Sequence, residues 1–166
     1  MRALPALFVI ALLSLSACSK PKSEAQSGII GDAPASNPVI LTDVQVKTIQ
    51  KTLPAPYNTA DLVNGEKQFN KCRSCHTLGE GEINMTGPNL YTVFGRKSGT
   101  MKGYTYSEAM TAHNTVWDYD SLFVYLQSPG DVVKGTKMGF LGLKKDQDRR
   151  DVIAYIRVQT TKPVSQ

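Results

Sequence analysis

Several features that mark common protein classes are scarce or absent in this 166-residue chain. No apolar run reaches the roughly 20 residues that a transmembrane helix needs, and no segment alternates apolar and polar residues as a half-buried strand does. The formal charge is +5 at pH 7, but no arginine-rich run or basic stripe is present, which argues against nucleic-acid binding. Three cysteines are an odd number, so at least one does something other than form a disulfide.

The N-terminus has the pattern of an export signal. After Arg2 comes an apolar run from Ala3 to Ala17, which is too short to span a bilayer. It ends in Leu-Ser-Ala-Cys, which resembles the bacterial lipobox, where cleavage before the cysteine accompanies lipidation of its thiol. We therefore expect residues 1–17 to be a lipoprotein signal peptide and Cys18 to carry the lipid. The alternative is ordinary cleavage with a free Cys18, for which Leu15 is a poor residue.

The next stretch, residues 18–56, has the composition of a flexible tether. It is rich in Ser, Pro, Ala, Gly, Lys and Gln, with five prolines between positions 21 and 56. A short helix from Asp43 to about Lys51 is weakly patterned within it. From Tyr57 onward the pattern becomes globular, so the folded domain is expected at residues 57–166.

Within that domain the apolar spacing predicts helices and unusually long loops. The expected helices are, in chain order, Asn58 or Thr59 to about Arg73, Tyr106 or Ser107 to about His113, Asp118 to Gln127, and Asp146 to Thr160. The third is followed by Pro129, which ends it. The fold class is thus a small all-helical domain, and its long loops need something large to pack against, such as a cofactor.

The stretch CRSCH, residues 72–76, has three chemical interpretations. A zinc site needs four nitrogen or sulfur ligands, and this domain offers only His113 beyond the motif itself. A thioredoxin-like dithiol is expected near a βαβ pattern, which is not visible. C-x-x-C-H is the c-type haem attachment signature, and residues three and four apart share a helix face. Cys72, Cys75 and His76 can then contact the same flat molecule, so the haem interpretation is favoured.

Further motifs connect this assignment with a family. From Lys71 to about Val158 the chain resembles class I cytochromes c of the mitochondrial and bacterial c2 type. The matching stretches are CRSCHT (72–77), TGPNL (86–90), FGRKSG (94–99), GYTYSEA (103–109), Trp117, YLQSP (125–129), GTKM (135–138) and DVIAYI (151–156). The resemblance implies the class I fold around one haem c, bound covalently through Cys72 and Cys75.

The resemblance also implies which residues surround the haem. His76 and Met138 are the expected axial ligands, since Met138 stands in the GTKM motif and its competitors Met85, Met101 and Met110 do not. The carbonyl of Pro88 is expected to accept the second His76 ring N–H, with Gly87 permitting the close approach. The other expected haem contacts are Arg96, Tyr106 and Trp117 at a buried propionate, and Tyr125 and Thr136 near the methionine and the propionate. Gly65, Phe69 and Tyr155 correspond to the crossing of the first and last helices.

This sequence departs from the mitochondrial pattern at three positions. Met110 replaces an asparagine that serves an internal water network, and Gly130 and Asp131 replace a lysine pair that helps to dock partners. A basic rim is still expected around the haem edge, made of Lys71, Arg73, Lys137, Lys144 and Lys145.

The function implied is that of an electron carrier rather than an enzyme, because two protein ligands leave the iron no vacant site. We expect a monomeric, membrane-tethered monohaem cytochrome on the periplasmic side of a bacterial membrane, the inner one being favoured. Its expected partners are a quinol:cytochrome c reductase and a terminal oxidase or photosynthetic reaction centre. The alternatives are a haem peroxidase or gas-binding cytochrome, for which His113 is the spare histidine, and a fixed subunit of a larger oxidoreductase.

Overall fold

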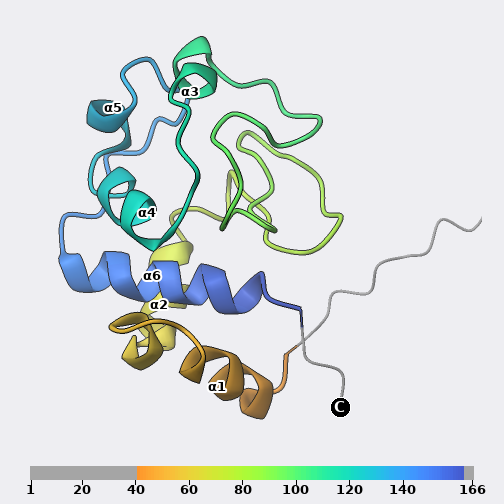
Figure 1. Ribbon diagram of the computed structural model, residues 1–166, viewed down its shortest axis with the longest axis vertical. Helices are drawn as coiled ribbons and strands as arrows, with labels where there is room; N and C mark the ends of the chain where they lie inside the picture. The colour runs from red at the N-terminus through yellow and green to blue at the C-terminus, as the bar shows by residue number, and fades with distance from the viewer. Residues whose placement is uncertain (1–40, 163–166) are drawn as a thin grey trace, which may run out of the picture. The chain divides into compact units, whose positions relative to one another are not determined.

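The computed structural model describes residues 41–162 of the chain. In this part the regular structure is helical, and its β structure is limited to one isolated antiparallel bridge between Lys97 and Val116. The elements are α1 (Asp43–Lys51), the 3₁₀ helix η1 (Tyr57–Thr59), α2 (Leu62–Phe69), α3 (Glu108–Ala112), α4 (Tyr119–Tyr125), α5 (Pro129–Val132) and α6 (Asp146–Gln159) (Figure 1). The all-helical fold class is confirmed. None of these helices is long and apolar enough to cross a bilayer.

Helix α1 corrects the extent of the predicted tether. Thr42 and Gln45 form a capping box at its start, and Ile49 and Leu53, four residues apart, are buried. The Gln50 side chain also donates to the Ala60 carbonyl at 2.7 Å. Residues 41–56, which composition assigns to the tether, are therefore packed on the helical unit. The signal peptide, Cys18 and the tether up to residue 40 lie outside the described residues.

The first predicted domain helix is shorter than its pattern suggests. It begins at Leu62 because the Asp61 carboxylate accepts from the backbone N–H groups of Val63 and Asn64, at 2.9 and 3.0 Å. It ends at Phe69, and residues 70–75 form successive turns rather than helix. These turns carry the CRSCH motif.

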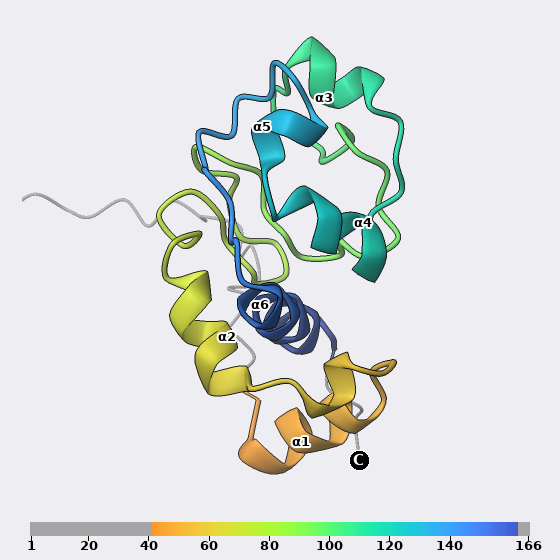
Figure 2. The same cartoon turned by 90° about the vertical axis from the view of Figure 1, so that its left-hand side faces the viewer.

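Helices α2 and α6 cross in direct contact. A Cβ added to Gly65 would collide with the Asp151 carbonyl oxygen and lie 2.7 Å from Tyr155 Cβ, so the predicted helix-crossing glycine is confirmed. Phe69 and Tyr155 pack beside it, with ring centroids 5.7 Å apart. The two views place α6 between α1 on one side and α3, α4 and α5 on the other (Figure 1, Figure 2).

The remaining predicted helices are present within a residue or two of their expected ends. Ser107 caps α3 and Asp118 caps α4, each accepting from a backbone N–H three residues on. The short helix α5 was not expected. It begins at Pro129, the residue predicted to end the preceding helix, because proline is well suited to the first helical turn. On α6 the expected apolar stripe is buried, with Ile153 fully inaccessible.

Candidate functional site

A cavity of about 430 Å³ is lined by residues of α3, α4 and α6 and of the loops around them, and by no residue of α1. Its apolar wall consists of Leu90, Val93, Leu122, Leu126, Phe140, Leu143, Val152 and Ile156. Cavities of a few hundred Å³ with apolar walls and a few polar groups are typical of cofactor and ligand sites. The long loops between α2 and α3 thus enclose a space for a large molecule.

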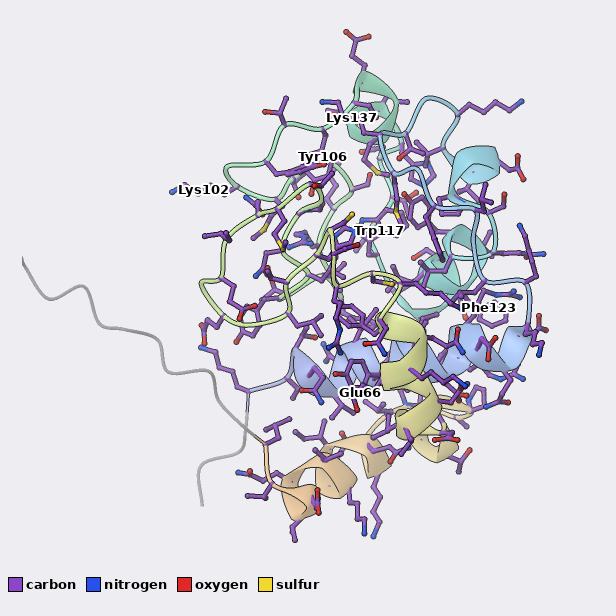
Figure 3. The ribbon with its side chains drawn as sticks, turned by 180° about the vertical axis from the view of Figure 1, so that it is seen from behind. Glu66, Lys102, Tyr106, Trp117, Phe123 and Lys137 are labelled. Carbon is purple, nitrogen blue, oxygen red and sulfur yellow. The ribbon has the colours of Figure 1, made fainter. Side chains whose placement is uncertain are left out.

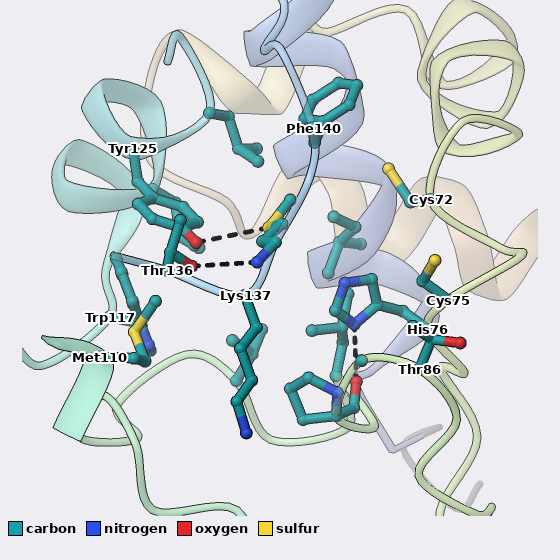
Figure 4. A pocket seen from close by; sticks show the side chains of 18 of the residues that line it. Cys72, Cys75, His76, Thr86, Met110, Trp117, Tyr125, Thr136, Lys137 and Phe140 are labelled. Atoms are coloured by element: carbon teal, nitrogen blue, oxygen red, sulfur yellow. Dashed lines mark hydrogen bonds between the residues drawn. The ribbon is translucent and has the colours of Figure 1, made fainter. Parts of the chain in front are cut away.

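The CRSCH turn places three chemically active side chains on one wall of this cavity. The backbone N–H groups of Cys75 and His76 both donate to the Cys72 carbonyl, at 2.9 and 3.0 Å. Cys72, Cys75 and His76 all line the cavity and lie together in Figure 4. Neither cysteine is in a disulfide within residues 41–162, and burial raises the pKa of the Cys72 thiol to about 11. No group of three or more His, Cys, Asp or Glu side chains in residues 41–162 is placed to hold a metal ion, so the zinc interpretation lacks a ligand set.

The His76 ring has a defined orientation and charge. Its Nδ1–H lies 2.7 Å from the Pro88 carbonyl, which accepts it, as expected from the sequence. Burial, chiefly, lowers the pKa of His76, and the nearby Arg96 charge lowers it further, while the bond to Pro88 acts in the opposite direction. The neutral ring therefore keeps Nε2 as its metal-binding nitrogen.

Gly87 is required by this arrangement. A Cβ at this position would collide with His76 Cε1 and lie 2.7 Å from Nδ1. Any side chain here would displace the imidazole, which explains the glycine of the TGPNL motif in steric terms.

Met138 and Met110 line the same cavity, whereas Met85 and Met101 do not. The Tyr125 hydroxyl donates to Met138 Sδ at 3.4 Å, and the Met138 backbone N–H donates to Thr136 Oγ1 at 3.2 Å. Figure 4 shows both interactions across the cavity from His76. Burial raises the pKa of Tyr125, so its hydroxyl stays protonated and remains a donor. Because Met85 and Met101 do not line the cavity, only Met110 and Met138 of the four candidates are placed to bind a ligand in it.

Arg96, Tyr106 and Trp117, which the sequence analysis expects at a haem propionate, also line the cavity. The Arg96 guanidinium donates to the carbonyls of Asn89 and Tyr91, at 3.0 and 3.1 Å. Within residues 41–162 it makes no salt bridge, and burial lowers its pKa. A half-buried cation without a carboxylate partner suits a ligand that carries its own carboxylates. Together with the thiols, the imidazole and the thioether, it fits a haem with its propionates.

Some predicted residues lie elsewhere. Lys71 and Lys137 of the predicted basic rim line the cavity, whereas Arg73, Lys144 and Lys145 do not. His113 stacks near Trp117, with centroids 5.7 Å apart, and also does not line it. The apolar wall was not recognised from the sequence, since apolar spacing alone does not distinguish a residue facing a cavity from one in a packed core.

Comparison with known proteins gives the same assignment. A family model described as "Cytochrome c" matches residues 62–160. The chain belongs to the cytochrome c family. It is similar to cytochrome c of Stellaria longipes, 45% identical over 105 residues, which are 63% of this chain and 97% of that protein. The cytochromes c of Cochliobolus lunatus and Kluyveromyces lactis are each 42% identical over 105 residues, covering 63% of this chain and 97% and 96% of theirs.

As a cytochrome c, the chain binds one covalently attached haem c and carries electrons; it is not an enzyme. The matched region begins at the first residue of α2 and ends just after α6. Helix α1 and η1 therefore precede the part of the chain that the family model covers.

Proposed function

We propose that this cytochrome c is a membrane-tethered, periplasmic carrier of single electrons between a quinol:cytochrome c reductase and a terminal oxidase or reaction centre. The observation that carries the electron-transfer part is the pair of ligand side chains, His76 and Met138, that line one apolar cavity. When bound, the haem supplies an iron that gains and loses one electron. The imidazole of His76 and the thioether of Met138 would hold this iron, and with both bound it would offer no site to a substrate.

Each residue of the site has a distinct role in this proposal. Cys72 and Cys75 attach the haem, and the Pro88 carbonyl holds His76 in the orientation needed for its Nε2 to bind iron. Thr136 and Tyr125 hold Met138 from its backbone and its sulfur. Arg96, Tyr106 and Trp117 line the place for a propionate, and the apolar wall keeps water from the iron.

Replacement of Met138 tests the axial pair. In Met138→Ala the iron would lack one ligand, so all of the ferric protein should bind added cyanide, while the wild type should bind it slowly. Absorption spectra recorded during a cyanide titration measure this. Met85→Ala is the matched control, because Met85 is partly exposed and lies off the cavity. A Met138→Ala protein that keeps the wild-type low-spin spectrum and resists cyanide would reject Met138 as the ligand.

A peroxidase or gas-binding role has less support. Such chemistry needs an open iron position and a nearby acid–base group. Among the described residues no carboxylate and no second histidine lines the cavity. A cytochrome whose unmodified ferric form reacts rapidly with cyanide or peroxide would favour that role instead.

The membrane location rests on the sequence of residues 1–18. In this proposal residues 18–40 are the tether between the lipid on Cys18 and α1, whose Ile49 is buried in the helical unit. Twenty-three residues of coil have an r.m.s. span on the order of 26 Å. Cys18→Ser should move the protein from the membrane to the soluble fraction, as judged by immunoblotting after cell fractionation. A variant that stays membrane-bound would contradict the lipid anchor.

Docking to an acidic partner is supported by the two lysines at the cavity. Lys71 Nζ donates to Gln68 Oε1 at 2.6 Å, and Lys137 Nζ donates to the Thr105 carbonyl at 3.0 Å. Their charges should steer an acidic partner toward the haem edge, so the association rate should fall as ionic strength rises. Stopped-flow measurement with an isolated oxidase tests this, and a rate that is independent of salt would count against it.

A further inference from the structure

Arg149, in the first turns of α6, is a buried charge that the proposed electron-transfer site does not use. It is 2% exposed. Its Nη1 donates to the carbonyls of Leu143 and Lys144, at 2.6 and 3.0 Å, and its Nη2 donates to Asp146 Oδ1 at 2.6 Å. The guanidinium lies over the Phe123 ring, 4.3 Å from its centroid, and Figure 3 shows Phe123 beside one end of α6. Burying a cation is costly, so its contacts call for an explanation.

The two carbonyls belong to the end of the segment that carries Met138. That end is also held from the side of α4, since the Leu143 N–H donates to the Leu126 carbonyl and Lys144 Nζ donates to the Gln127 carbonyl, both at 2.8 Å. A Cβ on Gly142, whose φ is +93°, would collide with the Gln127 carbonyl. Residues 142–144 are thus fixed between two helices.

The segment from Met138 to residue 142 has few hydrogen bonds of its own to hold its backbone in place. Within the described chain, the backbone of residues 137–142 makes no backbone–backbone hydrogen bond. Five residues of extended chain span up to about 17 Å, so this stretch has ample length to move if its end is released. The position of Met138 then depends on where residues 143 and 144 are held.

We propose that Arg149 is a positioning residue that keeps Met138 in the cavity by fixing the end of its segment. The role suits arginine, because a planar fork of N–H donors reaches two carbonyls and a carboxylate at once, which a lysine ammonium on a flexible stem does not reproduce. The inference rests on the proposed role of Met138 as an axial ligand. A rival role, which the experiment separates, is that Arg149 only stabilises the start of α6.

The test compares Arg149→Lys with Arg150→Lys in the haem-loaded protein. Arg150 undergoes the same chemical change one residue along, where within residues 41–162 the side chain donates only to Gln147. In Arg149→Lys we expect cyanide to bind the ferric form about tenfold faster and the Leu143 amide to exchange hydrogen about tenfold faster, since one or two charged hydrogen bonds are lost. Arg150→Lys should match the wild type in both. If Arg149→Lys lowers only the denaturant midpoint and leaves both rates unchanged, the positioning role is wrong.

A second variant covers the case in which Arg149→Lys fails to accumulate. Gly142→Ala should loosen the same anchor from the side of α4 and accelerate cyanide binding, with Gly130→Ala, which lies off the cavity and has no atom within 4 Å of its added methyl, as control. Wild-type cyanide kinetics in Gly142→Ala would overturn the proposal. Failure of the proposed function looks different: the wild type itself would then bind cyanide as readily as Met138→Ala, while amide exchange at Leu143 would still report on the anchor.

Discussion

His76 and Met138 line the same cavity but are held in different ways. His76 lies in a run of backbone hydrogen bonds, its own N–H to Cys72 and the Gly87 N–H to Cys75 at 2.8 Å, and its ring is fixed by Pro88. Met138 has one backbone bond, to the Thr136 side chain, and one weak bond to its sulfur. Backbone hydrogen bonds hold the side of the cavity that carries His76, here called the histidine wall. Side chains and distant anchors hold the side that carries Met138, here called the methionine wall. Exchange of a protein ligand should therefore begin at Met138.

The largest expected effect comes from adding one methyl group to the histidine wall. Gly87→Ala should displace the His76 ring and destabilise the holoprotein by about 3 kcal/mol or more, because the atoms in the way belong to a ring that cannot turn aside. Gly130→Ala, in α5 and off the cavity, meets no atom within 4 Å and should behave as wild type. Denaturant unfolding and the yield of haem-bound protein measure both. Equal behaviour of the two variants would contradict the tight backbone support proposed for the histidine wall.

A smaller loss is expected where α2 leads into the histidine wall. Gly65→Ala gains about 1 kcal/mol in helix propensity, but its methyl would collide with the Asp151 carbonyl and Tyr155 Cβ. Overpacking against backbone costs about 1–3 kcal/mol, so we expect a net destabilisation of up to about 2 kcal/mol in denaturant unfolding. Gly130→Ala, in α5 with no atom nearby, provides the control and should be neutral or slightly stabilising. A stabilised Gly65→Ala protein would show that the helices can separate freely.

Removal of the hydroxyl that contacts Met138 should have a smaller effect still. In Tyr125→Phe the bond to Met138 Sδ, 3.4 Å long, is lost. Sulfur is a weak acceptor, so stability should fall by no more than about 1 kcal/mol, with modestly faster cyanide binding. A change as large as that of Gly87→Ala would mean that this one bond controls the methionine wall.

The least effect is expected from the surface ion pair near the histidine wall. Lys162 Nζ lies 2.9 Å from Glu80 Oε1, and this contact lowers the pKa of Glu80 and raises that of Lys162. Both groups are fully solvated, so salt screens their attraction. Glu80→Gln should leave the denaturant midpoint unchanged at physiological ionic strength. A clear drop would assign the ion pair a role in closing the loop that follows the CRSCH turn.

Much of this architecture follows from local sequence signals. Ser107, Asp118 and the apolar stripe around Ile153 placed three helices correctly, because caps and periodicity act within a few residues. The start of α2 was placed too early, since Asn58 and Thr59 resemble caps as well as Asp61 does. The packing of α1 was missed because a short, weakly amphipathic helix inside a proline-rich stretch gives no local sign of a distant partner.

The site itself was predictable only through the family resemblance. Spacing alone brought Cys72, Cys75 and His76 together, and nothing local connected them with Met138, 62 residues later. The contact of Pro88 with His76 likewise came from the family's motif. The anchor at Arg149 had no such signal, because its partners are backbone carbonyls, which every residue has.

The contact between α2 and α6 limits the order in which the chain can fold and be joined to haem. The Asp61 N–H and the Asp151 carboxylate, 3.0 Å apart, join residues separated by 90 positions. The contact cannot form until α6 has been made, and 84 residues follow Cys75 up to the end of α6. Val152 and Ile156 of α6 line the cavity together with the two cysteines, so the cavity is incomplete until α6 has docked. Haem that is joined to the chain before this docking has open access to both sulfurs.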